Sequence, residues 1–175
     1  MEQVRRAVRQ ALELSQENLQ ETRRSVLDLR AAPLEGRNLP EALSRLSEDI
    51  SSREGLPVKF RSVGGPRPLT TRIETGLFRV AQEALTNVVR HSGASEALLR
   101  LVTTPEHIEL SLEDDGAGFD PSQVPQERYG LVGIGERAKL LGGTMSVEST
   151  SGEGTRIKVR VPFPVDAADA EGDRT

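Results

Sequence analysis

The hydrophobic positions along the first part of the chain predict one long helix. Residues 1–32 contain no Gly or Pro, and their apolar residues recur every three or four positions, as on one face of a helix. Ser15 and Thr22 interrupt this narrow stripe, so we expect the helix to pack in a bundle or dimer rather than on a sheet. A helix standing alone in solvent is the weaker alternative, because isolated helices are marginal. The stripe consists of Val8, Leu12, Leu19, Val26 and Leu29.

The rest of the chain alternates between the helical period and the strand period. Apolar residues at helical spacing, bounded by Gly or Pro, predict helices over residues 39–53, 70–91 and 130–141. Alternating apolar and polar residues predict strands over residues 56–63, 96–103, 107–113, 144–149 and 155–161. Short connections make two of these strand pairs hairpins. The element order predicts a two-layer α/β sandwich, a mixed sheet with helices on one face, preceded by the long helix.

Composition and charge narrow the classes of function. The chain has 23 basic and 27 acidic residues, a net charge of −4 and an aromatic content of 3%, which argue against a nucleic-acid partner. The absence of cysteine excludes disulfides, thiolate nucleophiles and cysteine-bound zinc. The histidines are His91 and His107, so a metal is expected to have oxygen ligands. No apolar stretch approaches the roughly 20 residues that span a bilayer, and we expect a cytoplasmic chain.

The pattern suggests three segments with different roles. Residues 1–32 form the leading helix, 33–163 the α/β domain, and 164–175 an acidic tail without periodicity that we expect to be disordered. Because the chain starts abruptly in a helical pattern, we also expect that residues upstream have been removed.

Three glycine-rich loops are candidates for a nucleotide site. They are DDGAGFD at residues 114–120, GLVGIG at 130–135 and SGEGT at 151–155. Glycine lets backbone N–H groups approach a phosphate closely. Each loop alone is better explained as a turn or a linker. The sequence lacks the P-loop, dinucleotide-fold and protein-kinase motifs, which argues against those three classes.

A polar row on the predicted helix 70–91 strengthens the nucleotide hypothesis. In the run QEALTNVVRH, helical spacing places Glu83, Asn87 and Arg90 on one face. A carboxylate and an amide oxygen one turn apart suit a hydrated Mg²⁺, and an arginine a turn later suits the phosphates that Mg²⁺ bridges. For an isolated pair, a solvated helix face is the better explanation. The neighbouring glycine loops favour a site.

Taken together, these segments resemble the ATP-binding domain of sensor histidine kinases, in the group shared with gyrase, Hsp90 and MutL (the GHKL or Bergerat fold). EALTNVVRH resembles the N-box, DDGAGF and YGLVGIGERAKLLGG the two glycine boxes, and SGEGTRIKVRVP the closing strand motif, in the family's order. The segment RRSVLDLR further resembles the NarL/DesK-like subfamily. That resemblance makes residues 1–32 the second helix of a dimerisation hairpin.

The resemblance also implies roles for individual residues. Asp114 is expected to accept a hydrogen bond from the adenine amine, with Thr155 assisting through a water, while Gly116 and Gly118 leave room for the base. Residues 119–129, from Phe119 to Tyr129, are the expected lid. On the phosphate side, Asn87 is the expected Mg²⁺ ligand, and Glu83 beside it is expected to be a metal ligand and a catalytic residue. Arg90 and His91 are expected to contact phosphate or ribose. The helix opened by Gly130, Leu131 and Gly133 is expected to direct its N-terminus at the phosphates.

Three features depart from the family pattern. Asp115 stands where many relatives have Asn, and Arg128 replaces a glycine before the second glycine box. The family's phosphoacceptor histidine lies on the first dimerisation helix and is followed by an acidic residue. Neither His91 nor His107 has that setting, and both are better explained as ordinary exposed imidazoles.

The function favoured by the resemblance is the ATP-binding catalytic part of a histidine kinase, which presents Mg·ATP to a histidine outside this chain. Implied partners are ATP or ADP, a dimerisation domain, a response regulator and, at full length, a second copy. One alternative is another enzyme on the same fold, an ATPase or a serine kinase. A second is a non-catalytic nucleotide-binding or dimerisation module.

Overall fold

The computed structural model describes residues 34, 36–65, 67–120 and 129–163. The chain divides into Met1–Gly36 and Arg37–Thr175, and every helix and strand reported below belongs to the second unit. The predicted leading helix, most of the predicted lid and the acidic tail therefore lie outside the described residues.

The centre of the domain is a five-stranded sheet with the order β1-β2-β3-β5-β4. β1 pairs with β2 in parallel, and the β2–β3, β3–β5 and β4–β5 pairs are antiparallel. The expected mixed sheet and both expected hairpins are confirmed. The strands are β1 Val58–Val63, β2 Ala97–Thr103, β3 His107–Asp114, β4 Thr144–Thr150 and β5 Gly154–Pro162.

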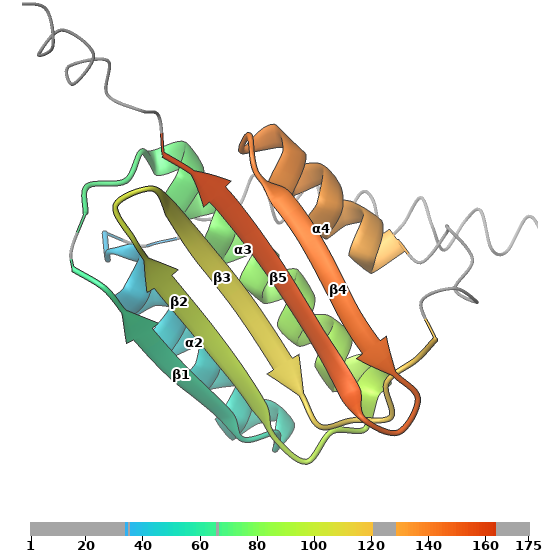
Figure 1. The fold of residues 1–175 in the computed structure, drawn as a ribbon. Coiled ribbons are helices and arrows are strands. Elements are labelled where there is room, and N and C mark those ends of the chain that lie inside the picture. The colour runs from blue at the N-terminus through green and yellow to red at the C-terminus, as the bar shows by residue number, and fades with distance from the viewer. Residues whose placement is uncertain (1–33, 35, 66, 121–128, 164–175) are drawn as a thin grey trace, which may run out of the picture. The chain divides into compact units, whose positions relative to one another are not determined.

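Three α-helices cover one face of this sheet, which confirms the expected two layers (Figure 1). They are α2 Leu39–Glu54, α3 Thr71–Asn87 and α4 Tyr129–Leu140. The core lies between the two layers, where large aliphatic side chains are fully buried and burial of apolar area is the main stabilising force. Its best-buried members include Leu43, Leu77, Leu85, Leu99, Leu101, Ile108, Ile134 and Val159.

The ends of α2 follow from local capping chemistry. The Asn38 side chain accepts a hydrogen bond from the Glu41 N–H, and the Glu41 carboxylate accepts one from the Asn38 N–H, which together form a capping box. Gly55 ends the helix with φ 71°, a left-handed conformation that costs glycine little. The predicted helix boundaries are correct to within one residue.

The helix predicted over residues 70–91 is wrong in its last turn. α3 ends at Asn87, and Val88–Ser92 continue as a π-helix, η1. Ser92 holds this wider turn in place, because its hydroxyl donates to the Val88 carbonyl at 2.8 Å and its own carbonyl accepts from the Ala117 N–H at 2.7 Å. A π turn changes the rotation per residue, so the regular α-helical spacing that includes Glu83 ends at Asn87.

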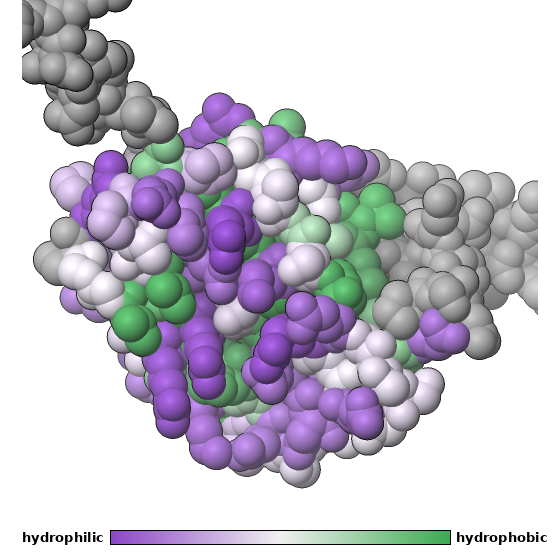
Figure 2. All heavy atoms as spheres, in the orientation of Figure 1, coloured by the Kyte–Doolittle hydropathy of each residue, from purple (hydrophilic) through white to green (hydrophobic). Residues whose placement is uncertain are grey.

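The face of the sheet without helices carries paired charges. Arg156 Nη2 lies 2.8 Å from Glu113 Oε2, Arg156 Nη1 lies 3.5 Å from Glu148 Oε2, and Arg160 Nη2 lies 2.8 Å from Glu109 Oε2. The strand register places these partners directly opposite one another. Figure 2 shows that this face is largely hydrophilic. The two pairs of Arg156 are exposed, suit contact with water and contribute little stability individually.

Candidate functional site

Asp114, Thr155 and the two glycine loops next to them come together at one end of the sheet. β3 ends there at Asp114, β5 begins beside it, and η1 ends nearby (Figure 1). Asp114 and Thr155 are direct partners in the β3–β5 register, although 41 positions separate them (155 minus 114). The sheet therefore brings the first and third glycine loops into contact.

Asp114 is a buried carboxylate with one oxygen occupied and one available. Asp114 is only 7% exposed, and its Oδ1 accepts a hydrogen bond from the Gly116 N–H at 2.9 Å. Among the described residues no buried side-chain polar atom lacks a partner, so Oδ2, for which no hydrogen bond is found, still reaches solvent. Burial raises the pKa of Asp114, and the charge of the neighbouring Asp115 also raises it. The hydrogen bond from the Gly116 N–H lowers this pKa but does not cancel the effect of burial.

Asp115 points outward and has a structural role. Its carboxylate accepts from the Ser95 N–H at 2.8 Å, from the Glu96 N–H at 3.0 Å and from the Ser95 hydroxyl. These donors, the Glu96 N–H first, lower the pKa of Asp115. Adjacent aspartates thus differ in environment, and the charge at position 115 holds the segment that leads from η1 into β2.

Gly116 and Gly118 allow the protein's own backbone to pack closely. A Cβ on Gly116 would lie 2.5 Å from the Ser92 carbonyl oxygen, and a Cβ on Gly118, where φ is +56°, would lie 2.0 Å from the Thr150 carbonyl oxygen. The intervening Ala117 donates to the Ser92 carbonyl at 2.7 Å and accepts from the Gly152 N–H at 2.6 Å. A side chain at either position would therefore clash with the protein's own backbone, independently of any space that a bound base requires.

The polar residues of α3 divide into two groups. Glu83 and Asn87 lie one turn apart on the α-helix and are both half-buried. Arg90 and His91 belong to η1 and are exposed. Arg90 therefore lies on the π turn, beyond the regular α-helix that carries Glu83 and Asn87. The pair of oxygen-bearing side chains remains.

The N-terminus of α4 lies where the sequence predicts a helix to begin. Tyr129 begins the helix, one residue earlier than predicted, and Gly130 and Leu131 follow in its first turn. A Cβ on Gly133 would meet no atom within 4 Å, so this side of the helix is open among the described residues. Unpaired N–H groups and the helix dipole make such an end favourable for an anion. Arg128 lies outside the described residues.

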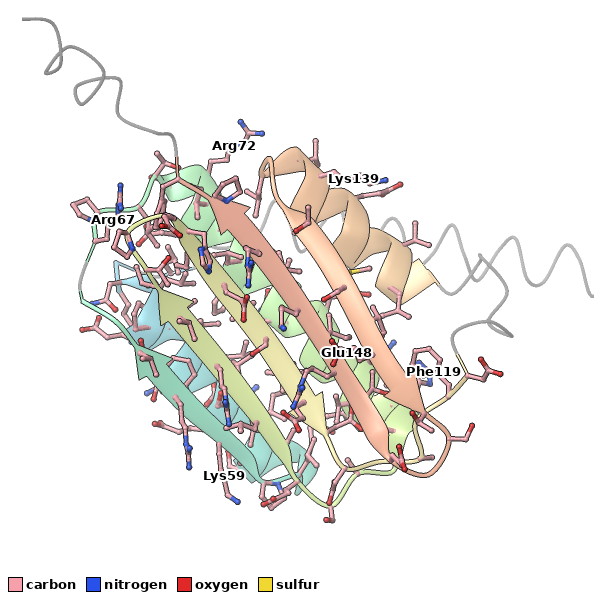
Figure 3. The ribbon with its side chains drawn as sticks, in the orientation of Figure 1. Lys59, Arg67, Arg72, Phe119, Lys139 and Glu148 are labelled. Carbon is pink, nitrogen blue, oxygen red and sulfur yellow. The ribbon has the colours of Figure 1, made fainter. Side chains whose placement is uncertain are left out.

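The structure adds Ser149 to the expected residues. Its Oγ lies 2.9 Å from Thr155 Oγ1, 2.9 Å from the Gly154 carbonyl oxygen and 2.9 Å from the Phe119 nitrogen. Phe119 is half-buried beside the end of β4 (Figure 3). The sequence holds one signal for this serine. Ser149 continues the inward-facing row of Met145 and Val147 on β4, and it is polar although the rest of that row is apolar.

In the part of the chain that the structure describes, no helix is both long and apolar enough to cross a membrane. No cluster of three or more His, Cys, Asp or Glu side chains suited to a metal ion is found among the same residues.

Comparison with known proteins identifies the domain. Residues 72–165 match the family model described as histidine kinase-, DNA gyrase B- and HSP90-like ATPase. The chain is 35% identical to the sensor histidine kinase LiaS of Bacillus subtilis over 167 residues, which are 95% of this chain and 46% of LiaS. It is 31% identical to the sensor protein VraS of Staphylococcus saprophyticus over 156 residues, 89% of this chain and 44% of VraS. The chain thus spans less than half the length of these relatives.

A solved structure agrees with this result. The ATP-binding domain of PrrB from Mycobacterium tuberculosis superposes with a TM-score of 0.58 and 26% identity, covering 73% of this chain and 96% of that domain. The expected fold and the expected family are both confirmed. The chain belongs to the family of histidine kinase-, DNA gyrase B- and HSP90-like ATPases, and its α/β domain is similar to the ATP-binding domain of PrrB.

Proposed function

We propose that this domain holds Mg·ATP and presents its γ-phosphate to a histidine located outside this chain, within a two-component sensor kinase. Phosphoryl transfer needs mainly positioning and neutralisation of charge, which a binding domain can supply without its own nucleophile. The proposal places the domain in the cytoplasm, where ATP is present, whether or not the complete protein is anchored in a membrane.

The observation that carries the proposal is the environment of Asp114. Its Oδ1 is satisfied by the Gly116 N–H, and its Oδ2 retains accessible surface at the end of β3. A fixed carboxylate with one free oxygen suits an N–H donor such as the exocyclic amine of adenine. Guanine has a carbonyl oxygen at that position, which would leave the buried carboxylate facing another acceptor.

Glu83 and Asn87 fit a magnesium ion that takes most of its ligands from phosphates and water. They supply one carboxylate and one amide oxygen a helical turn apart, and Mg²⁺ is commonly held by one or two protein oxygens together with substrate phosphates. Glu83 and Asn87 would hold such an ion, which would supply positive charge beside the phosphates. We assign Asn87 to metal binding, and Glu83 to metal binding and to the activation of the attacking group.

The remaining groups suit the phosphates and the ribose. Arg90 and His91 are exposed on η1 and carry donors. The first turn of α4, with Gly130 and Leu131, offers backbone N–H groups to an anion, and Gly133 in the next turn leaves open space beside the helix. We propose that residues 119–129 close over the nucleotide as a lid.

We also propose the partners that a domain of this kind requires. The phosphoacceptor would lie on the first helix of a dimerisation hairpin, of which residues 1–32 would be the second helix, and the phosphate would pass on to a response regulator. The complete protein would be a homodimer of the NarL/DesK-like type. His107 is a poor acceptor candidate, because it lies at the start of strand β3 and not on a helix.

Titration calorimetry with ATP and GTP tests the nucleotide assignment. Wild-type protein should bind ATP with Mg²⁺ and discriminate against GTP, and Asp114→Asn should lose at least about tenfold in ATP affinity, because a hydrogen bond to a charged group contributes roughly 1.5–3 kcal/mol. Asp115→Asn is the matched control, since its carboxylate faces the Ser95 and Glu96 backbone. Equal affinity for ATP and GTP in the wild type would refute the assignment.

Incubation with γ-labelled ATP tests the role in phosphoryl transfer. The chain alone should form no acid-labile phosphohistidine, and addition of the missing first dimerisation helix should restore labelling on that helix. Mass spectrometry that located the phosphate on His91 or His107 would contradict the proposal. Loss of labelling in Glu83→Ala with unchanged ATP affinity would support its catalytic role.

A further inference from the structure

We infer that Ser149 is a positioning residue that makes Thr155 a hydrogen-bond acceptor and so contributes to the choice of adenine. The inference rests on the proposed ATP site, in which Asp114 and Thr155 face the base. It concerns a residue on β4 that forms three hydrogen bonds within the protein.

Counting donors and acceptors fixes the direction of each bond. A serine hydroxyl has one hydrogen to donate and two lone pairs to accept with. The Gly154 carbonyl can only accept and the Phe119 N–H can only donate, so Ser149 donates to the first and accepts from the second. Its remaining lone pair is directed to Thr155 Oγ1, 2.9 Å away. All three contacts are satisfied together only if the Thr155 hydroxyl donates to Ser149.

This direction determines what Thr155 can offer to a ligand. Once its hydrogen is given to Ser149, the Thr155 oxygen can accept a hydrogen bond but cannot donate one. Thr155 lies directly opposite Asp114 in the sheet, and side chains of such partners are close neighbours. Asp114 and Thr155 therefore form a pair of acceptors, which suits a group with two hydrogens such as the adenine amine or a bridging water.

The same serine also holds the loop that leaves β3. The Phe119 N–H donates to Ser149 on β4. The preceding Gly118 passes close to the end of β4, because a Cβ built on Gly118 would lie 2.0 Å from the Thr150 carbonyl oxygen. One hydroxyl thus fixes the polarity of Thr155 and joins the loop after Asp114 to β4.

Substitutions of Ser149 test this by the ratio of ATP affinity to inosine triphosphate affinity, since inosine replaces the amine by a carbonyl. Ser149→Ala frees the Thr155 hydroxyl to rotate and donate, so the ratio should fall about three- to tenfold, the range expected for one neutral hydrogen bond. Ser149→Thr keeps the hydroxyl and should restore most of the ratio. Ser146→Ala, on the exposed row of the same strand, is the control and should leave the ratio unchanged.

A double-mutant cycle distinguishes this role from a structural one. If Ser149 acts through Thr155, Ser149→Ala should not change the ratio further in a Thr155→Val background. Equal loss of ATP and inosine triphosphate affinity, or the same change in both backgrounds, would overturn the inference. If Ser149→Ala does not fold, Ser149→Cys, a weak hydrogen-bonding group, serves the same comparison. Wild-type protein that binds no ATP would instead refute the proposed function itself.

Discussion

The substitution Gly133→Ala should make the protein more stable and at the same time a weaker nucleotide binder. Gly133 lies within α4, and a Cβ built there meets no heavy atom within 4 Å. Alanine is about 0.8–1 kcal/mol more favourable than glycine in a helix interior, because glycine loses more backbone entropy on folding. With no steric cost, the free energy of unfolding should rise by about 0.5–1 kcal/mol and the melting temperature by roughly 2–4 °C.

The effect on binding should have the opposite sign. The space beside Gly133 is open, and the proposed function assigns it to the approaching phosphates. A methyl group there would hold a phosphate away from the backbone N–H groups of the first turn. We expect ATP affinity to fall by at least about tenfold, or ~1.4 kcal/mol.

Gly135→Ala is the matched control on the same helix. Its Cβ would lie 3.4 Å from the Met145 Cε atom, an ordinary contact, so it should stabilise the helix similarly without loss of binding. Thermal unfolding and calorimetry on the three proteins separate the two effects. Wild-type ATP affinity in Gly133→Ala would refute the phosphate assignment, and a lowered melting temperature in both variants would refute the propensity argument.

Three further predictions concern the loop that ends β3. As the pH is lowered, ATP affinity measured by calorimetry should begin to fall at a higher pH than it would with an ordinary aspartate, because burial raises the pKa of Asp114. In Asp114→Asn this fall should be absent, apart from the effect of protonation of adenine itself. The stabilisation by Asp115 should be fully present above the ordinary aspartate pKa and disappear as the pH falls through its lowered folded pKa. The stability difference between wild type and Asp115→Asn in denaturant titrations should therefore shrink in acid, and a constant difference would contradict this. Gly116→Ala should cost at least about 1–3 kcal/mol of unfolding free energy, because its Cβ would lie 2.5 Å from the Ser92 carbonyl oxygen, and an unchanged denaturation midpoint would contradict it.

Local chemistry made the helices and hairpins predictable. Asn38 and Gly55 carry the start and stop signals of α2 in their own side chains and backbone preferences. The β2–β3 pair is joined by a short connection, so its antiparallel pairing follows from the distance along the chain alone. In both cases the determining residues are neighbours in the sequence.

Features set by distant contacts were not predictable in the same way. The alternation within each strand does not reveal that β5 lies between β3 and β4, because that order depends on packing across the whole sheet. The π turn after Asn87 depends on the Ser92 carbonyl accepting from Ala117, which lies on another loop. Ser149 was missed for the same reason, since each of its partners is at least five positions away.

The family motifs located the candidate site but do not test the role of each residue. Their order placed Asp114 and Thr155 in one site, and the β3–β5 register makes them direct neighbours. Motif spacing assumes regular helical rotation, however, and so it did not predict that Arg90 lies on a π turn beyond Glu83 and Asn87. The assignments to base, metal and phosphate stay predictions for the experiments above.

The register that joins Asp114 to Thr155 also has a consequence for how the protein folds. Two of the strand pairs are local hairpins that can form within microseconds, namely β2 with β3 and β4 with β5. The β3–β5 pair closes a much longer loop, and the entropic cost of closing it comes before any stabilising contact forms. Neither hairpin alone contains both Asp114 and Thr155. The recovery of nucleotide binding during refolding should therefore lag behind the formation of strand structure, and ATP should act late, by stabilising the docked hairpins rather than by speeding the formation of either one.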